Sequence, residues 1–314
     1  MPAATEFTDE RVFMNTRIQI TLISDRGTVA ARTAINDAYT QFDNVVKRFT
    51  RFEPSSELSR LNASSGQIFP VSEDLFSLIE TMLSVAEKTD GAFDPTIIDL
   101  LEMYGFSKEQ DYTRMNDPDF LGNIRSYVKD RPSFREIELD RDAMTVRLVR
   151  GQRLDLGSIG KGYAIDLAAE KLSGHTGFKI NAGGDLRAGG THADGSPWKL
   201  GVVKLGLPNK AISDPELLGY IETEAAALAG SGGWVRRVAW FHHLLNPKSG
   251  LPDNTSSQSY VTAASATAAD LWSTALFVTG SDGIRLLEKE NDIEGMLISS
   301  DGSVHSSRGF SLLT

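Results

Sequence analysis

The chain has 314 residues and no cysteine, and its formal charge of −10 accompanies a pI near 5.1. This length supports one large domain or two modest ones, and folding alone can bury a sizeable core without help from a cofactor. The acidic balance argues against a general binder of nucleic acid or of anionic membranes, because both need a broad basic surface. The absence of cysteine excludes disulfides, thiolate nucleophiles, Cys-based zinc sites and iron–sulfur clusters.

The beginning of the chain carries acidic residues and lacks the apolar core of a signal peptide. Nowhere does the sequence approach the ~20 consecutive apolar residues that a membrane-spanning helix needs. We therefore expect a cytoplasmic protein without a transmembrane segment. The alternative is a periplasmic protein whose export signal has been trimmed.

The first half of the chain contains three strongly patterned segments. Residues 16–23 alternate apolar and polar side chains, which predicts a half-buried strand. Residues 28–48 and 73–88 place apolar side chains at helical spacing and predict two amphipathic helices. Between these helices, residues 49–62 hold a proline and several serines, which indicates a structured loop. Residues 107–135 are polar and lack a sustained period, so we expect a surface insertion or a connection between lobes.

The second half is built from shorter segments. Residues 136–139 and 144–149 flank a turn and predict a β-hairpin. Further short strands are indicated at 178–181, 198–203, 219–229, 235–241 and 258–264, with a helix from about 266 to 278. Strands and helices follow one another without a regular βαβ period. We therefore predict an α+β fold with mixed or antiparallel sheets and packed helices, in preference to a doubly wound sheet.

The most informative local pattern is a glycine-rich turn at 157–162 that runs into an amphipathic helix. Such a turn presents backbone N–H groups and the positive end of a helix dipole to an anion. Lys161 would add a positive charge, and Asp155 would accept hydrogen bonds from ligand hydroxyls or ring N–H groups. The glycine spacing matches neither the phosphate loop nor Gly-x-Gly-x-x-Gly. An ordinary turn between a strand and a helix is therefore an equal alternative.

Asp270 and Thr274 are four residues apart in the predicted C-terminal helix, so one helix face carries both. A carboxylate and a hydroxyl are hard oxygen ligands of the kind that Mg2+ takes together with water and phosphate oxygens. The structural alternative is a first-turn aspartate on the helix dipole and a threonine bonded to its own backbone. For this pair alone, the structural alternative is favoured.

His242 and His243 stand at the end of a predicted strand and are two of only five histidines. An imidazole is suited to proton transfer near neutral pH, although a single histidine is more often structural. No His-x-x-x-His spacing occurs, which argues against an imidazole zinc site. Two further segments, 91–96 and 180–186, are rich in turn-forming residues. Each by itself indicates a turn or a bulge.

Taken together and in this order, these segments resemble the ApbE family of flavin transferases, the FAD:protein FMN transferases. The resemblance spans nearly the whole chain. It rests on the motifs at 14–16, 55–62, 91–96, 155–166, 181–185, 231–232, 243–250 and 269–275. It implies an ApbE-like, T-fold-related architecture in a single domain over residues 1–314, formed either as one body or as two lobes around a cleft. Residues 107–135 would be an insertion in that domain.

The resemblance also implies an activity: Mg2+-dependent transfer of FMN from FAD to a Ser or Thr hydroxyl of an acceptor flavoprotein, with release of AMP. FAD, the substrate, is expected to contact Met14, Ala92, Phe93, Asp94, Asp155, Lys161 and Leu244. Mg2+ is expected to bind Ser158, Asp270, Thr274 and the Ser273 carbonyl. His243 and Asp270 are the expected catalytic residues, the first for proton handling at the attacked phosphate and the second through the metal.

Two positions depart from the family pattern. Asn15 stands where the family usually has glycine, and Asn246 stands where it usually has aspartate before the proline. An amide at position 246 would orient an imidazole or bind a metal less well than a carboxylate. Ser158 can serve a metal through its hydroxyl or its carbonyl. Two other functions use the same residues: a Mg2+-dependent FAD pyrophosphatase that yields FMN and AMP, and a non-catalytic FAD-binding protein, against which the retained Asp270 and Thr274 speak.

Overall fold

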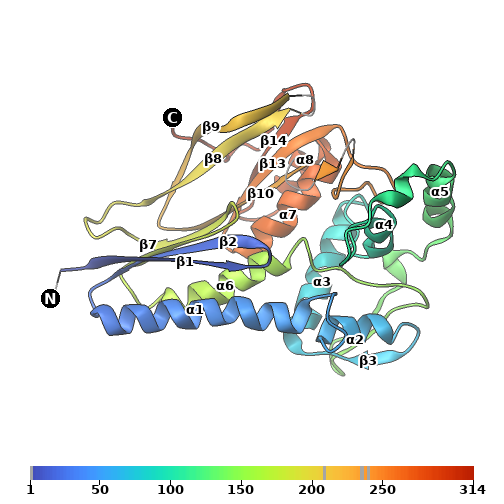
Figure 1. Ribbon diagram of the computed structural model, residues 1–314. Helices are drawn as coiled ribbons and strands as arrows, with labels where there is room; N and C mark the ends of the chain where they lie inside the picture. Colours follow the sequence, from blue (N-terminus) through green and yellow to red (C-terminus); the bar gives the residue numbers. More distant parts are fainter. Residues whose placement is uncertain (1–2, 208–209, 234–236, 239–240) are drawn as a thin grey trace.

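An eight-stranded antiparallel sheet forms the centre of the computed structural model of the chain (Figure 1). In their order across the sheet, its strands are β1 (Thr5–Phe13), β2 (Thr16–Ser24), β6 (Gly177–Ala182), β7 (Asp185–Gly190), β10 (Ala225–Gly232), β13 (Ser256–Ala263), β14 (Glu294–Ser299) and β15 (Val304–Ser306). The structure describes residues 3–207, 210–233, 237–238 and 241–314, with the side chains of all but 205–215 and 237. The antiparallel pairing of these strands, together with the helices described below, confirms the predicted α+β class.

Strand β2 confirms the alternating pattern predicted at 16–23. Ile18, Ile20 and Leu22 are fully buried against the helices, and Ile20 pairs with Ile180 of β6. Strand β1 was not predicted, because most of its side chains are exposed and it lies at the edge of the sheet, where no alternating apolar pattern is needed.

The turn between β1 and β2 explains one departure from the family pattern. Met14 and Asn15 both have left-handed backbone angles, with φ of 51° and 57°. Two successive residues with positive φ form the tight hairpin turn that matches the twist of paired strands. Glycine adopts this conformation without steric cost, and asparagine tolerates it better than most residues. Asn15 can therefore replace a glycine here, whereas Met14 is held in a conformation that is unusual for its type.

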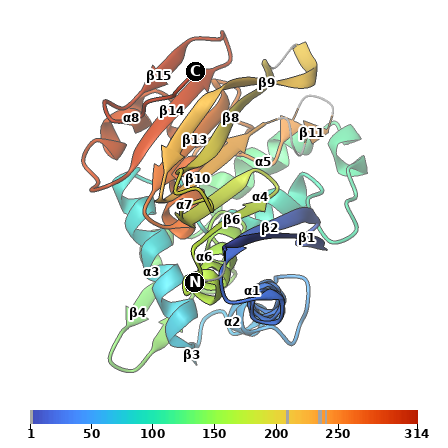
Figure 2. The ribbon, with the colours of Figure 1, turned by 90° about the vertical axis from the view of Figure 1, so that its left-hand side faces the viewer.

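Three helices cover one face of the sheet: α1 (Thr28–Phe49), α6 (Gly160–Leu172) and α7 (Ala266–Thr279). Figure 2 shows α1 end-on beneath β1 and β2, on the side that also carries α6. Helix α6 contacts α1 on one side and α7 on the other, while α7 packs on β10 and β13. The helices predicted at 28–48 and 266–278 are confirmed, and so is α3 (Glu73–Lys88). In the described part of the chain, no helix is long and apolar enough to span a membrane.

Smaller sheets flank the main one. Strands β3 (Ile68–Pro70), β5 (Thr145–Arg147) and β4 (Glu138–Asp140) form a three-stranded sheet that contains the predicted hairpin. The long strands β8 (Trp198–Leu207) and β9 (Lys210–Thr223) form a ribbon. The strand predicted at 219–229 is in fact divided between the end of β9 and the start of β10. Strands β11 (Arg237–Val238) and β12 (Phe241–His242) lie in the segment predicted at 235–241, part of which is outside the described residues.

Helices replace irregular structure in two segments. The predicted loop at 49–62 contains α2 (Glu57–Ala63), which begins where the Ser56 side chain accepts a hydrogen bond from the Ser59 N–H at 3.0 Å. Residues 107–135 contain α5 (Phe120–Asp130) between the short helices η1 (Thr113–Asn116) and η2 (Phe134–Glu136). Apolar side chains at 120, 121, 124, 127 and 128 of helix α5 do follow helical spacing, but this period covers little more than two turns of a segment that is otherwise polar.

Helix α5 packs with α4 (Ile98–Met103) at the end of the molecule opposite the N-terminus (Figure 1). Their apolar side chains form a separate cluster with Phe241 and Leu245. The hydroxyl of Tyr104 donates to the carbonyl of Gly250 at 2.9 Å, which joins this cluster to the turn that follows the paired histidines. The remaining helix, α8 (Asp282–Leu287), precedes β14. The segment 107–135 is thus tied to one of the motifs of the predicted site.

Candidate active site

The starts of helices α6 and α7 lie against each other at the centre of the predicted site. In the first turn of α6, the backbone N–H of Gly162 donates to Oδ2 of Asp270 on α7 at 2.9 Å. Gly162 has no space for a side chain, because a Cβ there would overlap the carbonyl of Ala266. Helix α6 has no side-chain cap of its own at Ile159, so Asp270 provides the carboxylate that stabilises the positive end of its dipole.

Asp270 is nearly buried, with 6% of its surface exposed. Burial raises the pKa of its carboxyl group, while Lys161 and the Gly162 N–H act in the opposite direction. Among the described residues, Gly162 is the one donor of a hydrogen bond to this side chain, and it uses only one of the two oxygens. A carboxylate that is buried with an oxygen left over gains stability from a nearby cation. The Asp270 carboxylate therefore fits the role of a Mg2+ ligand.

Thr274 lies one helical turn after Asp270, as the spacing predicted, and meets a group of hydroxyls. Its Oγ1 is 3.2 Å from Oγ of Ser231 on β10, which is 2.8 Å from Oγ of Ser273. Ser273 itself is fully buried and faces the sheet: its Oγ donates to the Asp270 carbonyl at 2.9 Å, and its own carbonyl accepts from Ser259 Oγ at 2.6 Å. Asp270 and Thr274 thus share a face, whereas the Ser273 carbonyl is already hydrogen-bonded within the protein.

Lys161 forms an ion pair with Asp185 at the start of β7. Asp185 is 2% exposed, and its other oxygen accepts from the Gly230 N–H at 3.3 Å. It follows Gly183 and Gly184, whose φ values of 66° and 104° turn the chain from β6 into β7. The sequence indicates a turn in this segment and includes 181–185 among the family motifs, but it assigns no role to Asp185. The ion pair with Lys161 places Asp185 beside the predicted site.

The turn that carries Met14 lies beside the turn at Gly183. The Gly183 N–H donates to the carbonyl of Arg17 at 3.1 Å, and a Cβ on Gly183 would overlap the Thr16 side chain. These contacts bring Met14 close to the strand that holds Asp185, and through Asp185 to Lys161. Ser158, a predicted metal ligand, lies in the turn that immediately precedes α6.

Asp94 and Asp155 form another part of the predicted site. The Asp155 N–H donates to the carbonyl of Pro95 at 2.9 Å, so the two predicted FAD-binding segments are adjacent. Oδ1 of the buried Asp94 accepts from the backbone N–H and the hydroxyl of Thr96 at 2.8 and 2.6 Å, which stabilises the turn. Its Oδ2 pairs with Arg131, at the end of α5. Two other predicted contacts, Phe93 and Leu244, are buried in the main apolar core, and Ala92 is partly exposed beside Phe93.

Two arginines near these aspartates escaped the sequence reasoning. Arg131 lies in the segment without a period, so nothing in the sequence linked it to Asp94. Arg51 has its Nε 3.8 Å from Oδ1 of Asp155, and it donates to the carbonyl of Phe106 at 2.7 Å. With only 11% of its side chain exposed, Arg51 is held in place beside Asp155. Both arginines add positive charge to a protein that is acidic as a whole.

The two histidines have different surroundings. His242 is 2% exposed and hydrogen-bonded at both ring nitrogens: Nδ1 accepts from the Leu244 N–H at 3.2 Å, and Nε2 lies 3.0 Å from the carbonyl oxygen of Asp253. This pattern requires a neutral ring with its proton on Nε2, so His242 is structural. His243 is half-buried, and its ring packs edge-on against Phe106 at 6.2 Å between centroids. Phe106 thus links His243 with Arg51.

Asn246 stabilises a turn. Its Oδ1 accepts from the backbone N–H groups of Lys248 and Ser249 at 2.9 and 3.2 Å. An aspartate would accept the same two hydrogen bonds through one carboxylate oxygen. Replacing aspartate with asparagine therefore preserves the turn that follows His243, while it removes a negative charge from the segment.

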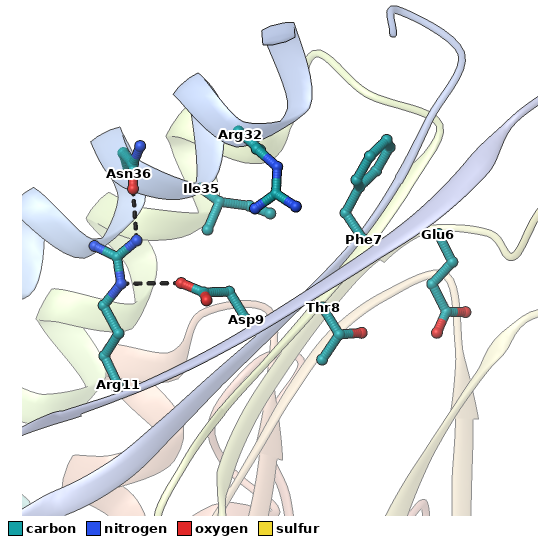
Figure 3. A pocket seen from close by; sticks show the side chains of 8 residues that line it. All are labelled: Glu6, Phe7, Thr8, Asp9, Arg11, Arg32, Ile35 and Asn36. Carbon is teal, nitrogen blue, oxygen red and sulfur yellow. Dashed lines mark hydrogen bonds and ion pairs between the residues drawn. The ribbon is translucent and has the colours of Figure 1, made fainter. Parts of the chain in front are cut away.

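Neither a pocket nor a cluster of metal-binding side chains marks the predicted site. A pocket of about 240 Å³ between β1 and α1 contains none of the predicted site residues (Figure 3). There Arg11 is held by Asp9 at 2.9 Å and by Asn36 at 2.5 Å, so opposite charges are already paired. No group of three or more His, Asp or Glu side chains is placed to hold a metal within the described ranges. The predicted metal site has a single carboxylate, so its other ligands must be hydroxyl, carbonyl, water or phosphate oxygens.

Comparison with known proteins identifies the family. The family model of the ApbE family matches residues 14–297. A FAD:protein FMN transferase of Haemophilus influenzae is 28% identical over 86% of this chain and 80% of its own, and one of Escherichia coli is 24% identical over 84% and 76%. The crystal structure of an ApbE protein of Thermotoga maritima superposes with a TM-score of 0.83 at 27% identity and covers 97% of each chain. Because the family model matches far more than half of its length, this chain belongs to the ApbE family.

Proposed function

We propose that this protein is a FAD:protein FMN transferase, which moves FMN from FAD onto an acceptor protein. Membership of the ApbE family and the activity named for its relatives support this assignment. The structural observation that carries it is the pairing of two helix starts, in which the α6 N-terminus, Lys161 and the nearly buried Asp270 lie together. Such an arrangement can neutralise a pyrophosphate locally within an acidic protein.

The residues divide into three tasks. Lys161 and the positive end of the α6 dipole would attract and orient the pyrophosphate, while the Gly160 and Gly162 N–H groups donate to the Leu156 carbonyl and to Asp270. Asp270, Thr274 and Ser158 would hold Mg2+, with Ser273 as the weakest candidate because its carbonyl already accepts a hydrogen bond. When bound, Mg2+ would polarise the pyrophosphate and offset its charge. Met14, the segment 92–94, Asp155 and Leu244 would contact the rest of FAD.

The proposed transfer forms one bond to phosphorus and breaks another. The oxygen of a Ser or Thr hydroxyl on the acceptor attacks the phosphorus on the FMN side, and the bond from that phosphorus to the bridging oxygen breaks. AMP leaves with the bridging oxygen, and FMN remains joined to the acceptor as a phosphoester. An alcohol needs a base to become an effective nucleophile, and we assign this role to His243, which would take the hydroxyl proton.

The test is an incubation of the purified protein with FAD, Mg2+ and an acceptor that carries an Asp-Gly-x-Ser/Thr-Gly-Ala-Thr target. A flavin-fluorescent acceptor band that disappears with chelator supports the proposal. The matched control is the same acceptor with its target Ser or Thr replaced by Ala, which should stay dark. Free FMN without a labelled acceptor would instead indicate a pyrophosphatase, and intact FAD would contradict both enzymatic functions.

A further inference from the structure

Helices α6 and α7 each supply a carboxylate to the start of the other. Asp270, in the second turn of α7, accepts from the Gly162 N–H in the first turn of α6. In return Asp166, in the second turn of α6, accepts from the backbone N–H groups of Ala266 and Thr267 at 2.8 and 2.9 Å. The first turn of each helix is thus bound by the second turn of its neighbour.

Asp166 completes the cap of α7. The first four N–H groups of a helix have no partner within the helix itself. In α7, Asp166 accepts from two of these groups, those of Ala266 and Thr267, and Ser265 Oγ accepts from a third, that of Ala268, at 3.1 Å. The Ala269 N–H then makes the first regular helical bond, to the Ser265 carbonyl at 3.1 Å. Without Asp166, two buried or half-buried donors would lose their acceptor. The position of the α7 start therefore depends on a side chain from α6.

Both oxygens of Asp166 are used within the protein. Oδ2 also accepts from the Thr267 hydroxyl at 2.5 Å, and Oδ1 is paired with Arg187 of β7. With four donors from two neighbouring elements, the carboxylate has little freedom to move. Such a group is suited to holding other residues in place and poorly suited to binding a ligand of its own.

The close contact at Gly162 and the hydrogen bonds of Asp166 together determine where α7 places Asp270. Because the Gly162 backbone lies against the Ala266 carbonyl, the two helix starts cannot approach further, and Asp166 prevents them from moving apart. Asp270 follows Thr267 by less than one turn of a rigid helix, so a shift of the α7 start carries Asp270 with it. Its distance from the α6 N-terminus and Lys161 is thereby set.

We propose that Asp166 is a positioning residue, which fixes the start of α7 against α6 and so places the Asp270 carboxylate at the metal site. The inference rests on the metal role of Asp270 in the proposed function. The four partners found for Asp166 are all groups of the protein, so its role at the metal is indirect. Residues that orient a metal ligand typically change metal affinity by roughly 10- to 100-fold when they are replaced.

The test compares the natural chain with Asp166→Asn, using Mn2+ alone as the probe and electron paramagnetic resonance to count free ions. Asp166→Asn keeps the shape of the side chain but turns an N–H2 group toward backbone donors. We expect Mn2+ binding to weaken roughly 10-fold, as for other residues that support a metal ligand. In the transfer assay, the Mg2+ concentration for half-maximal rate should rise by a similar factor, with a smaller loss of rate at saturating Mg2+.

The matched control is Glu170→Gln, which removes one negative charge from the exposed end of the same helix. Its Mn2+ affinity should stay within about twofold of the natural chain, since long-range charge effects at an exposed site are screened by salt. Equal weakening in Glu170→Gln and Asp166→Asn would mean that net charge alone is responsible, and this result would overturn the inference.

A second variant covers the possibility that Asp166→Asn does not fold. Thr267→Val removes only the hydroxyl that donates to Asp166, and a severalfold weakening of Mn2+ binding is expected. Suppose that the folded Asp166→Asn and Thr267→Val variants bind Mn2+ as the natural chain does, while Asp270→Asn loses binding. The positioning role of Asp166 is then wrong, and the role of Asp270 at the metal is supported. If Asp270→Asn still binds Mn2+, the metal role itself is wrong and the inference falls with it.

Discussion

Replacement of Asp270 by alanine separates the chemical role of this side chain from its structural one. The variant removes the acceptor for the Gly162 N–H at the start of α6, and the loss of such a cap costs about 1 kcal/mol of stability. An opposing contribution comes from the carboxylate, whose raised pKa shows that its ionised form is disfavoured by burial. The net loss should therefore be about 1 kcal/mol or less, well below the ~2–5 kcal/mol of a large-to-small change in the core.

The catalytic consequence should be far larger. If Asp270 is the only carboxylate at the metal, Asp270→Ala should lose FMN transfer at every Mg2+ concentration, while it unfolds cooperatively in urea near the natural midpoint. Asp37→Ala, on the exposed face of α1, is the matched control and should keep both activity and stability. Unfolding of Asp270→Ala at a denaturant concentration typical of a core deletion would show that the aspartate is structural. Undiminished Mg2+-dependent transfer would equally refute its role at the metal.

Other predictions follow from single contacts. Gly162→Ala places a methyl group against the Ala266 carbonyl, so denaturant unfolding should show a loss of about 1–3 kcal/mol, and transfer should fall with it. Unchanged stability would mean that the helix starts can separate. Lys161→Gln removes a charged donor to the pyrophosphate and should raise the KM for FAD roughly 10-fold in steady-state assays, because charge-assisted hydrogen bonds are worth about 1.5–3 kcal/mol. Burial and the neighbouring Arg26 lower the pKa of His175, so its proton binds more tightly in the unfolded chain and stability should fall as the pH drops below the normal histidine range. Melting curves of His175→Gln should show a weaker pH dependence, and an identical slope would contradict this. Because the chain lacks the acceptor motif, mass spectrometry of the protein after incubation with FAD should find no covalent flavin.

Local patterns predicted the elements in which one face is apolar and long. The alternation around Ile18 and Ile20 correctly indicated β2, and the helical spacing before and after Asp270 and Thr274 correctly placed both on one face of α7. Elements with few buried side chains escaped prediction. The apolar period of helix α5 covers little more than two turns of a polar segment, and the edge strand β1 is mostly exposed, so neither element stands out in the sequence.

By itself, the sequence determined the features whose pattern lies within a short stretch of the chain. These are the main strands and helices, the glycine turn before α6, and the helix face that carries Asp270 and Thr274. Only the tertiary structure decided their partners. The contacts of Asp270 with Gly162 and of Asp166 with Ala266 join residues 108 and 100 positions apart. They exist because the strand order of the sheet sets α6 beside α7, and no local period encodes that order. A carboxylate is placed at the start of α6 only because a second helix packs against it.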